Sequence, residues 1–265
     1  MSSIRRTIQV LDLLAGKGPL GVRAVAQQLG LPIGSVHRLL ADLAEESVVE
    51  RTEEGTWRLS YRLLAITDKQ LDGVKFPRLA HPHCERIAEA THETVNLNVL
   101  SGLSCVCIDK VRGSQGMQLD LPIGARGPLY CGGGAKAMLA FLGEAVVARV
   151  VGQTMAPFTA NTIVEGGALR AELARIRERG YAIDDQEMVI GVFCVGVPIV
   201  DRAGTGIGAI SISGPSRKAP NAAIRPLVEM LSGAAQQVSS RLGYAGAWPP
   251  RPVDRELETA SWGAR

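Results

Sequence analysis

The sequence predicts an α+β protein in two parts: a small helical N-terminal part that ends in a β-hairpin, and a larger part in which strands and helices alternate. Three observations predict this class. Two short amphipathic helices separated by a glycine-proline turn occupy residues 21–43, and two β-prone runs follow at 48–51 and 56–59. From residue 79 onward, strand-like alternation and helical periodicity follow one another, which is typical of an α+β domain.

Residues 21–43 have the pattern of a helix-turn-helix. Gly30 and Pro32 end the first helix, because glycine accepts a left-handed cap and proline cannot continue a helix. We expect the second helix to begin near Ser35, with its polar face turned to solvent. Such a face can enter the major groove of DNA; the alternative is an ordinary helical hairpin inside a core. The apolar positions of the two helices are Val22, Val25, Ala26 and Leu29, then Val36, Leu39, Leu40 and Leu43.

The flanks favour DNA binding. Ile4, Ile8, Leu11 and Leu14 predict a preceding helix, and the turn 52–55 joins the two β-prone runs into a wing. Residues 1–60 hold equal numbers of basic and acidic side chains, so non-specific affinity should be modest and two modules should act together. The residues expected to face double-stranded DNA are Arg6, Arg23, Ile33, Gly34, Ser35, His37, Arg38, Arg51 and Arg58.

Composition narrows the class of protein. With 265 residues, 46% of them hydrophobic, the chain can bury two cores, and its net charge is only +3. No apolar run approaches the ~20 residues of a membrane span. The five cysteines are odd in number and scattered, which suits reduced thiols and predicts a cytoplasmic protein rather than a disulfide framework.

The predicted organisation has four segments. The DNA-binding part is expected at 1–60, a linker helix at 61–76, a sensor-like domain at 77–243 and a flexible, proline-rich tail at 244–265. Leu63, Leu64, Ile66 and Leu71 form an apolar stripe on the linker helix, from which we expect a homodimer or a dimer of dimers. In the third segment, helices are expected at 79–91, 132–142, 143–152, 169–179 and 221–242, and strands at 95–100, 104–109, 116–121, 180–183, 192–200 and 207–213.

Several separated blocks, taken in order, resemble the IclR family of bacterial transcription regulators over residues 4–243. The blocks are LGLPIGSVHRLLADL, VVERTEEGTWRLSYRLL, TVNLNVLSG, IGARGPLYCGGGAKAMLA, IRERGYAIDDQEMVIGVFCVGVPIVD and AISISGP. The resemblance implies a winged helix-turn-helix, a linker helix and a C-terminal GAF-like effector-binding domain. It further implies a dimer or tetramer that regulates a metabolic, generally catabolic, operon in response to a small organic or aromatic acid.

The chain departs from the family pattern at several positions. The family usually has a basic residue where Ile33 stands, so a phosphate contact is expected to be missing there. The usual glycine after the second helix is Ser47, and the histidine before the glycine-led helix is Tyr130. These changes leave the fold intact but prevent transfer of the operator or effector identity.

The resemblance also implies where an effector binds. Glycines at the start of the helix at 132–142 expose backbone N–H groups that favour an anion. Ser211 and Ser213 are two apart on one strand, so their hydroxyls share a side. Asp184 beside an anionic ligand is awkward, so we assign it to a ligand hydroxyl or to bracing a loop. The expected effector-binding residues are Met117, Leu119, Leu121, Gly133, Gly134, Asp184, Val192, Cys194, Ser211 and Ser213.

Other chemistry has weaker support in the sequence. His81, His83 and Cys84 diverge on a helix, so we expect no metal, and no cofactor or catalytic fingerprint is present. We therefore expect a protein that is not an enzyme. One competing class remains, a GAF-type cysteine redox enzyme or oxidant sensor, which would depend on Cys131.

Overall fold

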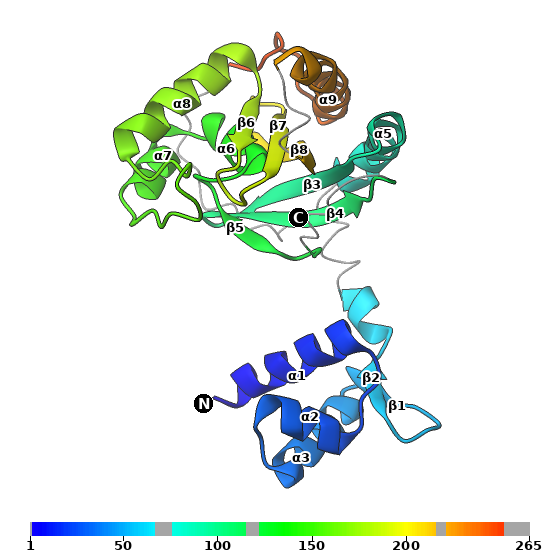
Figure 1. Cartoon of the computed structure of the whole chain (residues 1–265). Coiled ribbons are helices and arrows are strands. Elements are labelled where there is room, and N and C mark those ends of the chain that lie inside the picture. The colour runs from blue at the N-terminus through cyan, green and yellow to red at the C-terminus, as the bar shows by residue number, and fades with distance from the viewer. Residues whose placement is uncertain (1, 67–75, 115–121, 216–220, 252–265) are drawn as a thin grey trace. The chain divides into compact units, whose positions relative to one another are not determined.

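The computed structural model describes residues 2–66, 76–114, 122–215 and 221–251 (Figure 1). The chain divides into two compact units, Met1–Val74 and Lys75–Arg265, and the boundary falls inside the expected linker. Among the described residues, no helix combines the length and apolar character that a bilayer span requires.

The N-terminal unit is a three-helix core with a two-stranded wing. Its elements are α1 (Ser3–Lys17), α2 (Val22–Leu29), α3 (Ile33–Glu45), β1 (Val49–Arg51) and β2 (Trp57–Leu59). Gly30 caps α2 in the left-handed conformation, as predicted. α3 begins two residues before Ser35, directly after Pro32. Its buried residues Val36 and Leu40 pack with Val10, Leu14 and Val25 in one hydrophobic cluster.

The C-terminal unit is built on a six-stranded antiparallel sheet with the order β5-β4-β3-β8-β7-β6. The first and last long strands therefore lie side by side at the centre. The strands are β3 (Thr94–Ser101), β4 (Ser104–Val111), β5 (Arg126–Pro128), β6 (Ala182–Asp185), β7 (Val192–Val200) and β8 (Gly206–Pro215).

Helices cover both faces of this sheet (Figure 1). α5 (Phe76–Thr91) and α9 (Asn221–Arg241) pack together on one face, and α6 (Gly133–Ala140) lies on the other. α7 (Glu144–Val151) and α8 (Gly166–Arg179) lie outside α6 and complete the core around it. The sheet face under α6 carries the polar and thiol side chains, which makes that face the place for a site.

Two expectations about this unit need correction. The short strand β5 pairs with β4 but was not predicted, because its three residues lack a periodic pattern; the predicted strand 116–121 lies outside the described residues. The tail was expected to be flexible from residue 244. Instead, Tyr244 and Trp248 pack against the hydrophobic core, and Pro250 is buried. Partial burial of these two aromatic rings offsets the cost of ordering this short segment.

Candidate functional site

The exposed face of α3 holds the side chains predicted to face DNA. Ser35, His37 and Arg38 are exposed, and Ile33 at the start of the helix is 54% exposed. The buried residues of α3 face the three-helix core, so the polar face is fixed outward. Ser47, which follows the helix, has a φ of 56°, the left-handed conformation that favours glycine. The glycine-to-serine departure at this position therefore leaves the turn geometry unchanged.

A groove of about 510 Å³ runs between the start of α1 and the start of α3. Arg6, Ser35 and Arg38 line it, together with the turn that precedes α3. The Nε atom of Arg6 is buried and has no hydrogen-bond partner within the described part of the chain. The groove therefore holds two guanidinium groups and a hydroxyl, with the carboxylate of Asp42 in the same lining. The guanidinium groups and the hydroxyl suit phosphate oxygens.

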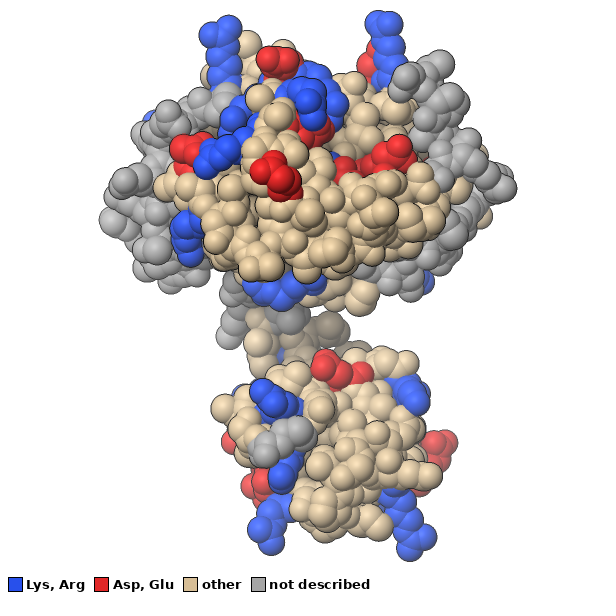
Figure 2. Space-filling view, turned by 60° about the vertical axis from the view of Figure 1, so that its left-hand side comes forward, with Lys and Arg blue, Asp and Glu red and all other residues tan. Residues whose placement is uncertain are grey.

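The wing contributes less positive charge than its sequence indicates. Arg58 forms an ion pair with Glu50 at 2.6 Å, whereas Arg51 is exposed. Arg23 on α2 is also exposed. On the face of the N-terminal unit visible in Figure 2, basic side chains are interspersed with acidic ones rather than gathered in one patch. This arrangement agrees with the zero net charge of residues 1–60.

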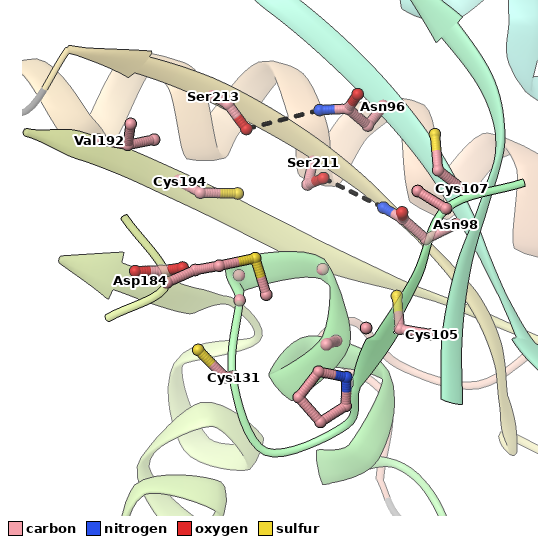
Figure 3. A pocket seen from close by; sticks show the side chains of 18 of the residues that line it. Asn96, Asn98, Cys105, Cys107, Cys131, Asp184, Val192, Cys194, Ser211 and Ser213 are labelled. Atoms are coloured by element: carbon pink, nitrogen blue, oxygen red, sulfur yellow. Dashed lines mark hydrogen bonds between the residues drawn. The ribbon is translucent and has the colours of Figure 1, made fainter. Parts of the chain in front are cut away.

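A cavity of about 270 Å³ opens on the sheet face beneath the start of α6. All six strands of the sheet contribute residues to its lining, and Figure 3 shows side chains from several of them converging on it. The predicted residues that line it are Gly133, Gly134, Asp184, Val192, Cys194, Ser211 and Ser213. The remaining three predictions, Met117, Leu119 and Leu121, lie outside the described residues.

The start of α6 lies directly against the central strands because glycines allow the approach. A Cβ atom on Gly133 would lie 2.9 Å from the carbonyl oxygen of Cys194, and one on Gly134 would lie 2.7 Å from Nδ2 of Asn98. A Cβ atom on Gly196 of β7 would lie 2.4 Å from the backbone of Gly133. The start of α6 therefore borders the cavity at close range, with Gly133 and Gly134 in its lining. The first N–H groups of a helix have no intrahelical acceptor, which suits this helix start to an anion.

Two asparagines complete the polar floor, and sequence reasoning missed them. Nδ2 of Asn98 donates to Oγ of Ser211 at 3.2 Å, and Nδ2 of Asn96 donates to Oγ of Ser213 at 3.5 Å. All four residues are buried. The alternation in Val95–Leu100 already predicted a strand with both asparagines on one face. The polar identity of that face was the available signal.

Four thiols line the same cavity, those of Cys105, Cys107, Cys131 and Cys194. Burial raises the pKa of Cys105 and of Cys131 to about 12, and raises the pKa of Cys107 and Cys194 as well. The thiols are therefore protonated near neutral pH and act as small, polarisable wall groups. Within the described ranges, no three metal-ligating side chains gather in a way that could hold an ion.

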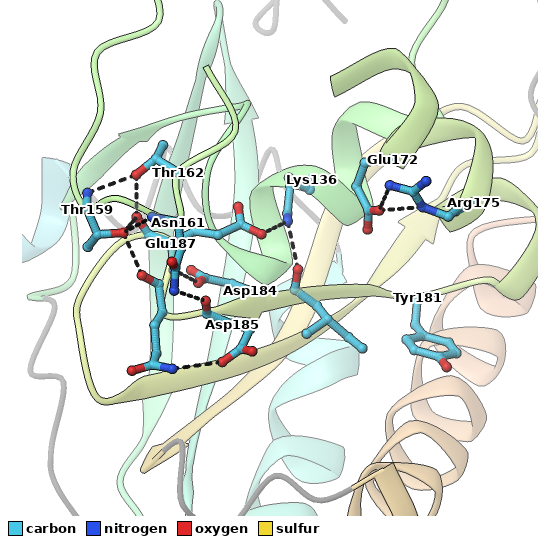
Figure 4. A network of polar contacts seen from close by, with 12 residues as sticks. Lys136, Thr159, Asn161, Thr162, Glu172, Arg175, Tyr181, Asp184, Asp185 and Glu187 are labelled. Carbon is cyan, nitrogen blue, oxygen red and sulfur yellow. Dashed lines mark hydrogen bonds and ion pairs between the residues drawn. The ribbon is translucent and has the colours of Figure 1, made fainter. Parts of the chain in front are cut away.

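The loop after β6 forms one wall of the cavity, and a polar network supports it (Figure 4). Oδ1 of Asp184 accepts a hydrogen bond from the backbone N–H of Glu187 at 2.6 Å. The hydroxyls of Thr159 and Thr162 donate to the carbonyl oxygen of Glu187 at 3.1 and 2.6 Å. The next residue, Met188, lines the cavity. The network thus holds the loop in place, and Asp184 has the bracing geometry that was one of its two predicted roles.

Lys136 of α6 connects this loop to the helix. Its ammonium group is buried, donates to the carbonyl oxygen of Ile183 at 2.7 Å and forms an ion pair with Glu187. Burial raises the pKa of Glu187 to about 7, although the Lys136 charge acts in the opposite direction. Sequence reasoning noted Lys136 only as part of a family motif, because its partner lies in a distant segment.

Arg126 is the only arginine or lysine among the described residues lining the cavity. Its Nη2 atom donates to the carbonyl oxygen and hydroxyl of Ser101 at 3.1 and 3.2 Å, and the residue is exposed. An anion bound near α6 must therefore be held chiefly by neutral donors, namely backbone N–H groups, hydroxyls and amides.

Both units of the chain match profiles of known protein families. The profile described as "Bacterial transcriptional regulator IclR C-terminal" matches residues 69–240, and the profile described as "IclR helix-turn-helix domain" matches residues 3–53. The acetate operon repressor of Salmonella typhimurium is 32% identical over 251 residues, which cover 93% of this chain and 91% of that protein.

Solved structures show the same relationship. The IclR structure from Thermotoga maritima has a TM-score of 0.81 and 31% identity, and the match covers 91% of this chain and 99% of that one. An IclR homolog from Microbacterium hydrocarbonoxydans, solved in complex with 4-hydroxybenzoate, shares the fold with a TM-score of 0.76 and 23% identity; the match covers 91% and 99% of the two chains. The chain belongs to the IclR family of bacterial transcriptional regulators.

Proposed function

We propose that this protein is a dimeric, sequence-specific repressor of a catabolic operon, and that a small organic acid bound beneath α6 controls its affinity for DNA. The observation that carries the proposal is that one chain combines an outward-facing α3 with a cavity that has mainly apolar walls and a polar floor. Curated relatives named as repressors support the sign of regulation. The 4-hydroxybenzoate complex of a homolog supports the class of effector.

The proposed DNA contacts centre on Arg38 and Arg6. Arg38 projects from the exposed face of α3, and Arg6 shares its groove. We assign Arg38 to a base edge and Arg6 to a backbone phosphate, with Ser35 and His37 beside them. A base contact affects sequence preference, whereas a phosphate contact affects affinity for all sequences and its dependence on salt.

Fluorescence anisotropy with DNA from the region upstream of the protein's own gene tests this assignment. Arg38→Ala should weaken binding by about 1–3 kcal/mol and relax preference at one position, whereas Arg6→Ala should reduce the salt dependence. Arg225→Ala is the control, because Arg225 lies on α9 in the C-terminal unit and its side chain is 85% exposed. Equal affinity and sequence preference for Arg38→Ala and the control would refute the role of α3.

Calorimetry with 4-hydroxybenzoate, benzoate and short aliphatic carboxylates tests the effector. At least one acid should bind, and saturation with it should change affinity for the upstream DNA. Ser211→Ala should weaken binding of that acid and leave DNA binding by the unliganded protein unchanged, because the two sites lie in different units. Full acid affinity in Ser211→Ala, or acid binding without any change in DNA affinity, would contradict the proposal.

A further inference from the structure

The cavity floor is a chain of four alternating amide and hydroxyl side chains, which we call the Asn–Ser ladder: Asn98, Ser211, Asn96 and Ser213. They come from the two central strands, in which Asn96 lies opposite Ser211 and Thr94 lies opposite Ser213. The diagonal contacts Asn98–Ser211 and Asn96–Ser213 place an amide beside each hydroxyl (Figure 3). We propose that the effector carries a hydroxyl group next to its carboxylate, and that the ladder forms hydrogen bonds with both groups.

The two serine hydroxyls of the ladder act as acceptors toward the asparagines. Each asparagine Nδ2 is a donor, so the serine oxygen that it contacts acts as the acceptor. The single hydroxyl proton of each serine is then directed toward Sγ of Cys194, which also interacts with the backbone N–H of Gly133. A thiol sulfur is a weak acceptor, so a ligand oxygen at this place would be the better partner for these donors. Both serines line the cavity, so the ladder holds two O–H donors beside the N–H groups of Gly133 and Gly134. A carboxylate, which only accepts hydrogen bonds, fits this donor end.

The ladder also contains a hydrogen-bond acceptor without a donor, the side-chain oxygen Oδ1 of Asn96. Asn96 is 5% exposed, and its Oδ1 atom has no hydrogen-bond partner within the described residues. A buried carbonyl oxygen left in this state costs free energy that a ligand donor would recover. A deprotonated acid has no donor in its carboxylate, so the donor must be a second group of the ligand.

The geometry of the Asn96 amide places the acceptor next to the donor end of the cavity. Oδ1 belongs to the same amide whose Nδ2 lies 3.5 Å from Oγ of Ser213. The acceptor and the donor end are therefore neighbours, and the ligand hydroxyl must lie close to its carboxylate, as in a 2-hydroxy acid. The apolar and thiol walls, which include Val192 and Met188, leave room for a carbon chain or a ring.

This inference rests on the proposed function. Pairs of acids that differ only in the hydroxyl group test the hydroxyl recognition separately from acid binding itself. The probes are three pairs of growing size: glycolate and acetate, lactate and propanoate, mandelate and phenylacetate. Calorimetry on the full-length protein gives the ratio of dissociation constants within each pair. In the best-bound pair, the hydroxy acid should bind at least about tenfold more tightly, as expected for a satisfied buried acceptor.

Two matched variants assign that preference to Asn96. Asn96→Leu keeps the branched shape but removes the acceptor, so the ratio should fall to near one. Asn98→Leu removes only the neighbouring amide, so both acids of the pair should weaken together and the ratio should persist. Asn96→Asp retains an acceptor; it should weaken all acids by charge repulsion while keeping the preference for the hydroxy acid. It also serves if Asn96→Leu fails to fold.

Several results would overturn the inference. Acids that bind the unmodified protein without preference for the hydroxyl would refute it while leaving the acid-effector function intact. The preference for the hydroxy acid could also persist in Asn96→Leu or disappear in Asn96→Asp. Either result would show that a group other than Asn96 binds the ligand hydroxyl. Failure of every acid, including 4-hydroxybenzoate and benzoate, to bind would refute the proposed acid effector itself, and this inference with it.

Discussion

The ammonium of Lys136 and the carboxylate of Glu187 form an ion pair inside the C-terminal unit, 51 positions apart in the sequence. Their side chains are only 1% and 9% exposed. The pair joins α6, whose first N–H groups are proposed to bind the effector, to the loop that forms one cavity wall. Its energetics therefore bear on both the stability of the unit and the shape of the site.

Removing one partner of this pair should be costly. Lys136→Met leaves a buried carboxylate without its counter-charge and should lower the free energy of unfolding by about 3–5 kcal/mol at pH 8. The double variant Lys136→Met/Glu187→Leu should recover much of that loss, since it buries no uncompensated charge. Urea unfolding of the three proteins gives the comparison. A double variant as unstable as the single one would show that the pair is not an isolated unit.

The Glu187 carboxyl should also make stability depend on pH. Its pKa is raised from an ordinary value of 4.5 to about 7 in the folded protein, so the folded state binds this proton more tightly than the unfolded state. The resulting stabilisation is complete below pH 4.5 and is lost as the pH rises through 7. Unfolding series at several pH values should show this decline, and Glu187→Gln should have a flatter profile over the same range.

Glycine substitutions near α6 should separate binding from folding. A Cβ atom on Gly134 meets the amide of Asn98, a side-chain end that can move, so Gly134→Ala should fold but bind the effector about tenfold more weakly. A Cβ atom on Gly196 meets the backbone of Gly133, which cannot move without shifting the helix. Gly196→Ala should therefore lower the melting temperature. Identical behaviour of the two variants in both measurements would contradict this account.

The cavity thiols should react slowly. Because the pKa of Cys131 is about 12, only about one thiol in ten thousand is ionised at pH 8. Iodoacetamide should therefore modify the native protein much more slowly than the urea-unfolded protein, as followed by mass spectrometry. Cys131→Ser should retain DNA binding and its response to the effector. Rapid alkylation of native Cys131, with loss of function, would favour the cysteine redox alternative.

The start of the linker is proposed to mediate dimer formation. Residues 62–66 are helical, and Leu64 and Ile66 are 62% and 52% exposed. Leu64→Glu should give folded monomers that bind DNA poorly, because two DNA-binding units then no longer act together. Ile33→Glu places the same charge on another exposed apolar residue and should remain dimeric. Sedimentation velocity measures both; a dimeric Leu64→Glu protein would exclude this surface.

Periodic segments explain why much of the fold was predictable. The helices around Leu40 and Ile176 and the strand around Leu97 carry apolar positions that repeat with the period of the element. The strand around Val195 was predicted from its continuous apolar run, and all of its residues are buried. The start of α3 differs by two residues because Pro32 fits the position before a helix as well as the end of a turn. β5 and the packed residues of the tail were missed because their structure depends on contacts with distant segments.

The candidate site likewise contains residues that could be predicted from the sequence and contacts that could not. The family resemblance implied Gly133, Gly134, Ser211 and Ser213, their local chemistry agreed with it, and the structure brings them together. Asn96 could not be paired with Ser213 from the sequence, because the two are 117 positions apart and meet only through the sheet order. The ion pair of Lys136 with Glu187 could not be predicted for the same reason, since the two residues are 51 positions apart. Long-range pairing, rather than composition, limited the prediction of the polar network.

The central pairing of β3 with β8 has a consequence for biosynthesis. The chain emerges from the ribosome from its N-terminus, so the helix-turn-helix can fold while the rest is still being made. The floor of the cavity cannot form until β8, ending at Pro215, is available to pair with β3. Such long-range contacts form slowly. A truncated or stalled chain would therefore contain a folded helix-turn-helix but lack the cavity that is proposed to bind the effector.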